Sequence, residues 1–164
     1  MATVVKAEHV NPFLMATIET FKAMMGTEIH PGKMMLGQNN KIPFDISGII
    51  GLSGGARGSV SLSFPRITAL KAVSEFAGTK VVSIDESVVD AIGELANIIA
   101  GAAKKDLSQY KIGISLPTVI KGDAHELTSP RDVIPLIVPF ESKFGNFCLI
   151  VSFKSEESPK GATP

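Results

Sequence analysis

The segment over residues 83–107 constrains the fold of this chain more than any other stretch. Its apolar residues cover most of a helix surface, whereas Asp90, Glu94 and Asn97 share one narrow polar stripe. At about 100° per residue, with Asp90 at zero, Glu94 falls at about 40° and Asn97 at about 340°. We therefore expect a helix that is buried on nearly every side except this stripe.

Two glycines interrupt the same helix, Gly93 and Gly101, and Gly101 falls on the stripe at about 20°. Each costs about 1 kcal/mol relative to alanine inside a helix, which indicates close approach of another backbone or of a partner surface. A buried amide without a partner costs about 1–3 kcal/mol, so Asn97 must be exposed, internally hydrogen-bonded or kept for a function. The residues alone leave a solvated seam and a docking surface equally open.

Composition excludes several classes of protein. A length of 164 residues predicts one domain over residues 1–153, followed by a disordered polar tail over 154–164. The formal net charge is zero, so neither nucleic acid nor an anionic membrane is an expected partner. No window resembles a membrane span or a secretory signal, which predicts a cytoplasmic protein. The three histidines are scattered, so no protein-built metal site is expected, and Cys148 is expected to be a buried, inert thiol.

The remaining patterns predict two more helices and several antiparallel strands. One helix is expected over residues 12–25 with Asn11 as its N-cap, and another over 65–78. The central helix is expected to begin at a capping box of Ser83 and Glu86, or at Asp85. Serines that alternate with apolar residues before Phe64 predict one solvent-exposed sheet face. The predicted strand segments are 29–36, 45–53, 56–64, 111–122, 133–142 and 144–153.

The segment ESVVDAIGELANIIAGAAKKDL, residues 86–107, resembles the signature helix of the CheC/CheX/FliY phosphatases of bacterial chemotaxis. In that motif an aspartate or serine is followed after three residues by glutamate and after two more by asparagine, here Asp90, Glu94 and Asn97. The family's downstream proline corresponds to Pro117, which lies a few residues nearer than in the family pattern. Three further segments resemble the CheX branch, so that the resemblance covers residues 8–153: NPFLMATIETFKAMMG, DISGIIGLSGGARGSVSLSF and ISLPTVIKG.

This resemblance implies an α/β fold of the α+β type, with two long helices packed on a mostly antiparallel sheet, and a homodimer. It also implies a protein phosphatase that hydrolyses the phospho-aspartyl group of a CheY-like response regulator. Such an enzyme has no cofactor of its own, because the phosphorylated regulator supplies Mg²⁺. One active site per chain is expected, because the first helix has Lys22 rather than asparagine three residues after Glu19.

Each stripe residue receives an expected role from the same resemblance. Asn97 positions the attacking water, since a carboxamide both donates and accepts hydrogen bonds, and Glu94 pairs with a lysine of the receiver active site. Gly93 and Gly101, from their spacing beside the stripe alone, are expected to let the helix approach the partner closely, and Asp90 is expected either to contact the partner or to cap the polar stripe.

Two other functions stay open at this point. One is a non-catalytic CheX-like module that binds a response regulator or another signalling protein. The other is an unrelated hydrolase that uses Asp90 and Glu94 as a carboxylate pair, against which the aliphatic surroundings argue.

Overall fold

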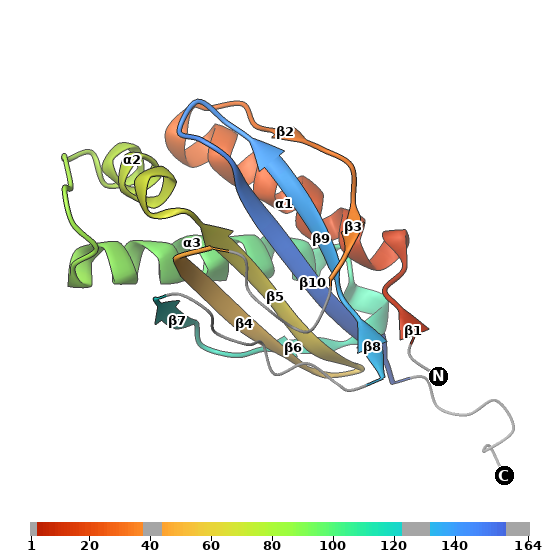
Figure 1. Cartoon of the computed structure of the whole chain (residues 1–164). Coiled ribbons are helices and arrows are strands. Elements are labelled where there is room, and N and C mark those ends of the chain that lie inside the picture. The colour runs from red at the N-terminus through yellow and green to blue at the C-terminus, as the bar shows by residue number, and fades with distance from the viewer. Residues whose placement is uncertain (1–2, 38–43, 123–131, 157–164) are drawn as a thin grey trace, which may run out of the picture.

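The computed structural model describes residues 3–37, 44–122 and 132–156. In this part of the chain two long helices, α1 (Ala7–Met25) and α3 (Glu86–Lys105), pack side by side behind an eight-stranded sheet (Figure 1). A shorter helix, α2 (Arg66–Ala77), packs against α3, and a 3₁₀ turn (Ser108–Tyr110) follows α3. The expected fold, two long helices on a mostly antiparallel sheet, is confirmed.

The sheet has the strand order β2-β9-β10-β5-β4-β6, with β3 paired to β9 and β7 paired to β4. All of these pairs are antiparallel, whereas β1 (Thr3–Val4) and β8 (Val133–Ile134) form a separate parallel pair. The strands of the large sheet are β2 (His30–Pro31), β3 (Met35–Leu36), β4 (Ile46–Gly54), β5 (Ala56–Phe64), β6 (Ile112–Ile114), β7 (Thr118–Lys121), β9 (Leu136–Glu141) and β10 (Phe147–Ser155).

The main core lies between the helices and the sheet. Alternate residues of each strand point to opposite faces, so Val60, Leu62 and Phe64 of β5 face the helices and are buried. Phe147 of β10 stacks on Phe64, with ring centroids 4.9 Å apart. This apolar face of the sheet determines the side on which α3 packs. It therefore also determines which face of α3 stays exposed.

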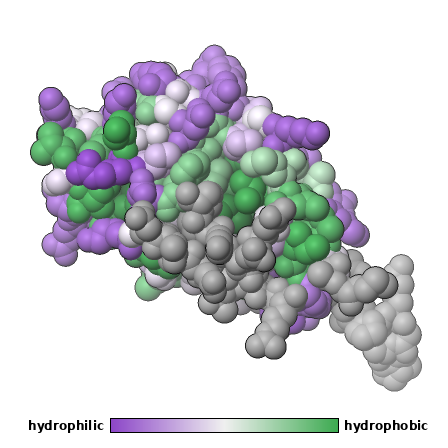
Figure 2. All heavy atoms as spheres, in the orientation of Figure 1, coloured by the Kyte–Doolittle hydropathy of each residue, from purple (hydrophilic) through white to green (hydrophobic). Residues whose placement is uncertain are grey.

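The opposite face of the sheet corrects one expectation, because its serines are buried rather than solvent-exposed. Ser61 of β5 lies in register between Ile49 of β4 and Ile150 of β10, so its small side chain is flanked by larger apolar ones. Ser47 donates a hydrogen bond of 2.9 Å to Ser63 across the same face. Figure 2 shows the molecule from this side, and patches of apolar surface are visible on it beside polar ones.

Cys148 also points to this second face, and the expectation of a buried thiol is confirmed. Its side chain is buried beside Ile150, with Phe44, Ile49 and Ile137 packed against the pair. Desolvation raises the pKa of the Cys148 thiol to about 12. Because the thiolate is the reactive form, the thiol is inert near neutral pH.

Helix α1 begins earlier than the sequence predicts. It starts at Ala7 rather than Pro12, and Pro12 lies in its second turn, so Asn11 is not the cap. The extra turn buries His9 and Val10. The His9 ring lies 4.3 Å from the Phe153 ring, centroid to centroid, and its Nε2 shares a hydrogen bond of 2.9 Å with Tyr110. This burial outweighs the hydrogen bond that the helix loses at proline.

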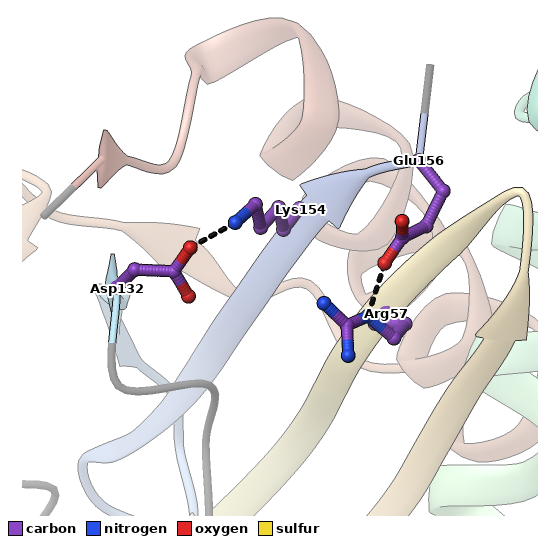
Figure 3. A network of polar contacts seen from close by, with 4 residues as sticks. All are labelled: Arg57, Asp132, Lys154 and Glu156. Carbon is purple, nitrogen blue, oxygen red and sulfur yellow. Dashed lines mark hydrogen bonds and ion pairs between the residues drawn. The ribbon is translucent and has the colours of Figure 1, made fainter. Parts of the chain in front are cut away.

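The final strand extends beyond residue 153, where the sequence places the start of a tail. Lys154 and Ser155 continue the ladder between β10 and β5, opposite Arg57 and Ala56. Two ion pairs hold this end of β10, one between Lys154 and Asp132 and one between Arg57 and Glu156 (Figure 3). Residues 157–164 of the predicted tail lie outside the described residues. No helix in the described part of the chain combines the length and apolar character needed to cross a membrane.

Candidate functional site

Helix α3 is positioned at its first residue by an N-cap. Asp85 accepts a hydrogen bond of 3.1 Å from the Val88 backbone N–H, so the cap is Asp85 and not Ser83. The Ser87 hydroxyl donates to the same carboxylate over 2.6 Å. These two hydrogen bonds lower the pKa of Asp85 below its usual value, and the hydrogen bond from Ser87 has the larger effect. The cap fixes where the helix begins.

The buried face of α3 holds it against the sheet and against α1. Val88, Ile92, Leu95 and Ile99 are almost completely buried and belong to the main core. At Gly48 of β4 the helix approaches the strand closely, because a Cβ atom there would lie 3.0 Å from the Ile92 carbonyl oxygen. Glycine at position 48 therefore sets the separation between α3 and β4.

The stripe on the other face of α3 is open to solvent. Asp90 and Glu94 are exposed and Asn97 is half-buried. Among the described residues, no side-chain hydrogen bond or ion pair engages any of the three. Asn97 is thus neither deeply buried nor hydrogen-bonded to another described residue, so exposure and a function remain as the alternatives. These side chains are free to contact a second molecule.

The two glycines of α3 have different surroundings. A Cβ atom on Gly93 would lie 3.3 Å from Val119 and 3.5 Å from Pro117, so this glycine packs against β7 and the residue that precedes it. A Cβ atom on Gly101 would have nothing within 4 Å. The structure therefore explains Gly93 by packing within the chain, whereas it provides no internal reason for Gly101.

The segment before β7 forms one border of the stripe. The Ser115 hydroxyl accepts a hydrogen bond of 2.8 Å from the Gly51 N–H and donates one of 2.8 Å to the Leu116 carbonyl. Leu116 is consequently held outward with 87% of its surface exposed, next to Pro117. The sequence does not point to Leu116, because the strand pattern around it does not distinguish an exposed turn from a strand.

The chemistry available on the stripe is limited to one carboxamide, two carboxylates and open surface. Within the described ranges, no group of three His, Cys, Asp or Glu side chains could hold a metal ion. The stripe offers hydrogen bonds and negative charge but no nucleophile such as serine or cysteine. It can orient groups that a partner brings, which favours action on a second protein over a self-contained hydrolase site.

Comparisons with known proteins agree with this geometry. A family model described as chemotaxis phosphatase CheX matches residues 46–141, a range that includes the whole stripe. A curated relative from Thermotoga maritima, named CheY-P phosphatase CheX, is 34% identical over 152 residues, which cover 91% of this chain and 97% of the relative. The chain belongs to the CheX family. Asp90, Glu94 and Asn97 thus lie within the region that defines the family match.

Solved structures of the family share the whole architecture. The chemotaxis protein CheX of Vibrio vulnificus is 32% identical, with a TM-score of 0.80 over 90% of this chain and 100% of that one. A CheC-like superfamily protein from Shewanella sp. PV-4 is 33% identical, with a TM-score of 0.82 over 92% of this chain and 100% of that one. CheX of Borrelia burgdorferi, solved with CheY, BeF₃ and Mg²⁺, has the same fold, with 24% identity and a TM-score of 0.77 over 92% of this chain and 100% of that one.

Proposed function

We propose that this chain is a phosphatase that hydrolyses the phospho-aspartyl group of a CheY-like response regulator. The observation that carries the proposal is the pair formed by Glu94 and Asn97, which have no hydrogen-bond or ion-pair partner among the described residues and lie on the open face of α3. The name of the T. maritima relative, CheY-P phosphatase, supports the same substrate.

The reaction needs a water molecule placed in line with the bond that breaks. The water oxygen bonds to phosphorus while the bond between phosphorus and the aspartyl oxygen breaks, which yields inorganic phosphate and a free carboxylate. The Asn97 carboxamide can hold this water, since its oxygen accepts a hydrogen bond from the water and its nitrogen donates one. Orientation of this kind can lower a barrier by several kcal/mol.

Glu94 lies three residues before Asn97, about 4.5 Å along the helix axis, so the two side chains are neighbours on the surface. We assign to Glu94 an ion pair with the lysine of the receiver active site, which would align Asn97 with the phosphoryl group. Asp90 and Gly101 lie on the same stripe, one to two turns away, and are proposed to contact the receiver. Gly93 would contribute through its place beside Pro117.

Mg²⁺ in this proposal belongs to the substrate. The B. burgdorferi complex contains CheY together with Mg²⁺. A bound cation neutralises charge on the transferring phosphoryl group. This chain therefore only has to orient the attacking water relative to that group. The proposed enzyme therefore has no cofactor of its own.

A non-catalytic regulator-binding module is the competing function, and a phosphate-release assay separates the two. Receiver domains are phosphorylated with a small-molecule phosphodonor in Mg²⁺, and phosphate release is followed with and without this chain. A phosphatase shortens the lifetime of the phosphoryl group at catalytic amounts of the chain. A module that only binds leaves that lifetime unchanged even at saturation, which would refute the proposal.

The homodimer expected for the family has support on the face of the sheet opposite the helices. Met35 of β3 is half exposed there, and it lines a hollow of about 300 Å³ together with mainly apolar side chains such as Ile137 and Pro139. We propose that two chains associate through this face, away from the stripe. Sedimentation equilibrium of wild type and of Met35→Lys tests this, since an unchanged molecular mass in the variant would contradict it.

A further inference from the structure

The stripe on α3 continues past Gly101 into a hollow that carries positive charge. The hollow has a volume of about 440 Å³ and is lined by Gly101, Lys104, Lys105 and Lys111, together with Ser108 and Ile112. On the helix, Lys104 falls at about 320° and Lys105 at about 60° on the scale that puts Asp90 at zero, so they bracket the stripe. The stripe is therefore acidic in its first half and basic at its end.

None of the three ammonium groups is neutralised within the described part of the chain. Lys104, Lys105 and Lys111 are exposed, and no ion pair joins them to a described carboxylate. Asp106 follows Lys105 but does not line the hollow. Lysines in the last turn of a helix also interact favourably with its dipole, but this does not account for Lys111, which precedes β6.

Two residues of the hollow are poor choices for folding. Gly101 leaves open space where alanine would favour the helix, and no neighbouring atom requires the glycine. Lys111 has a φ of 50°, a left-handed conformation in which glycine is more stable than an L-residue with a side chain. The absence of a side chain at Gly101 leaves room for a partner group, and Lys111 supplies a positive charge. Both features suit a surface that binds an anionic group.

We propose that this hollow binds acidic side chains on the surface of the receiver, beside its phosphorylation site. The inference rests on the proposed function, because Asn97 must face the phosphoryl group for the hollow to reach the receiver. At 1.5 Å per residue, the hollow begins about 6 Å from Asn97 and extends to about 12 Å along the helix axis. Glu94 then pairs with a cation of the receiver and the hollow with its anions, so the receiver can dock in one orientation only.

The proposal is tested by reversing charge with a matched control. The test variant is Lys104→Glu/Lys111→Glu. The control is Lys71→Glu/Lys80→Glu, because a second hollow beside α2 also carries lysines and shares no element with the stripe. Each variant is titrated with beryllofluoride-loaded receiver in Mg²⁺ and assayed for phosphate release over a range of receiver concentrations, and thermal melts compare their folding.

We expect the test variant to bind the loaded receiver about tenfold more weakly, with KM raised and kcat unchanged, because charges at the rim of an interface act on encounter. The control should stay within about twofold of wild type. Raising the salt concentration should weaken wild type more than the test variant. Equal affinities in both variants, or a loss in kcat alone, would overturn the inference. If the test variant lost affinity while wild type left the phosphoryl lifetime unchanged, the hollow would stand and the phosphatase assignment would fail.

Discussion

The two faces of α3 differ in what their residues do for the fold. The buried face packs Leu95 and Ile99 into the core and approaches Gly48 of β4 closely. The stripe side chains Glu94 and Asn97 make no hydrogen bond or ion pair with other described residues. Substitutions on the first face should therefore change stability, whereas substitutions on the second should change the action on the receiver and leave stability almost unaltered.

The largest effect on stability is expected for Leu95→Ala. Leu95 is completely buried, so its truncation leaves a cavity and should lower the free energy of unfolding by about 2–5 kcal/mol. Urea denaturation measures this change. The folded fraction should keep the specific activity of wild type. A loss below about 1 kcal/mol would show that the face is less tightly packed than described.

Gly48→Ala should also be destabilising, for the opposite reason. The new methyl group would lie 3.0 Å from the Ile92 carbonyl oxygen and 3.1 Å from the Ala96 methyl group. Both atoms belong to α3, which cannot easily move away from the strand. Overpacking of this kind costs about 1–3 kcal/mol. The same denaturation experiment checks it, and an unchanged midpoint would contradict the close approach of α3 to β4.

Glu94→Gln should separate binding from folding. The substitution removes the charge that pairs with the receiver, so we expect about tenfold weaker binding of beryllofluoride-loaded receiver, equivalent to about 1.4 kcal/mol. Stability should change by less than about 0.5 kcal/mol, as is usual for exposed positions. Glu75→Gln on the exposed face of α2 is the matched control. An equal effect of both substitutions would show that general charge, and not position 94, governs binding.

The smallest expected change in stability has the opposite sign. Gly101→Ala should stabilise the protein by about 0.5–1 kcal/mol, because alanine favours the helix and nothing crowds its methyl group. The same variant should bind the receiver less well if the partner surface approaches closely here. A thermal melt and a receiver titration of the same sample measure both effects, and a destabilised variant would refute the contrast with Gly48.

Periodicity predicted the helices and the order of the layers well, because burial of an apolar face determines both. It predicted the bounds of α2 and α3 nearly correctly, and it also predicted the polar stripe on α3. It failed where long-range contacts decide the outcome. The start of α1 depends on the packing of His9 against Phe153. The burial of Ser61 depends on its pairing with Ile150, which lies more than 80 residues further along the chain.

The site was predicted less completely than the fold. The stripe residues lie together as expected, and their exposure is now established, but the roles of Glu94 and Asn97 remain predictions. The sequence could not distinguish Gly93, which packs on Pro117, from Gly101, which faces open space. Nor could it bring Lys111 next to the end of α3, because that contact depends on the turn that follows the helix.

The role of Asn97 in hydrolysis can be measured as the rate constant of phospho-receiver hydrolysis at a saturating concentration of this chain, for wild type and for Asn97→Ala. Loss of an orienting group of this kind costs about 10²-fold or more in rate. We expect that Asn97→Ala folds normally, binds the beryllofluoride-loaded receiver with nearly wild-type affinity, and returns hydrolysis to the rate of the receiver alone. A variant that still accelerates hydrolysis to the wild-type extent would contradict it.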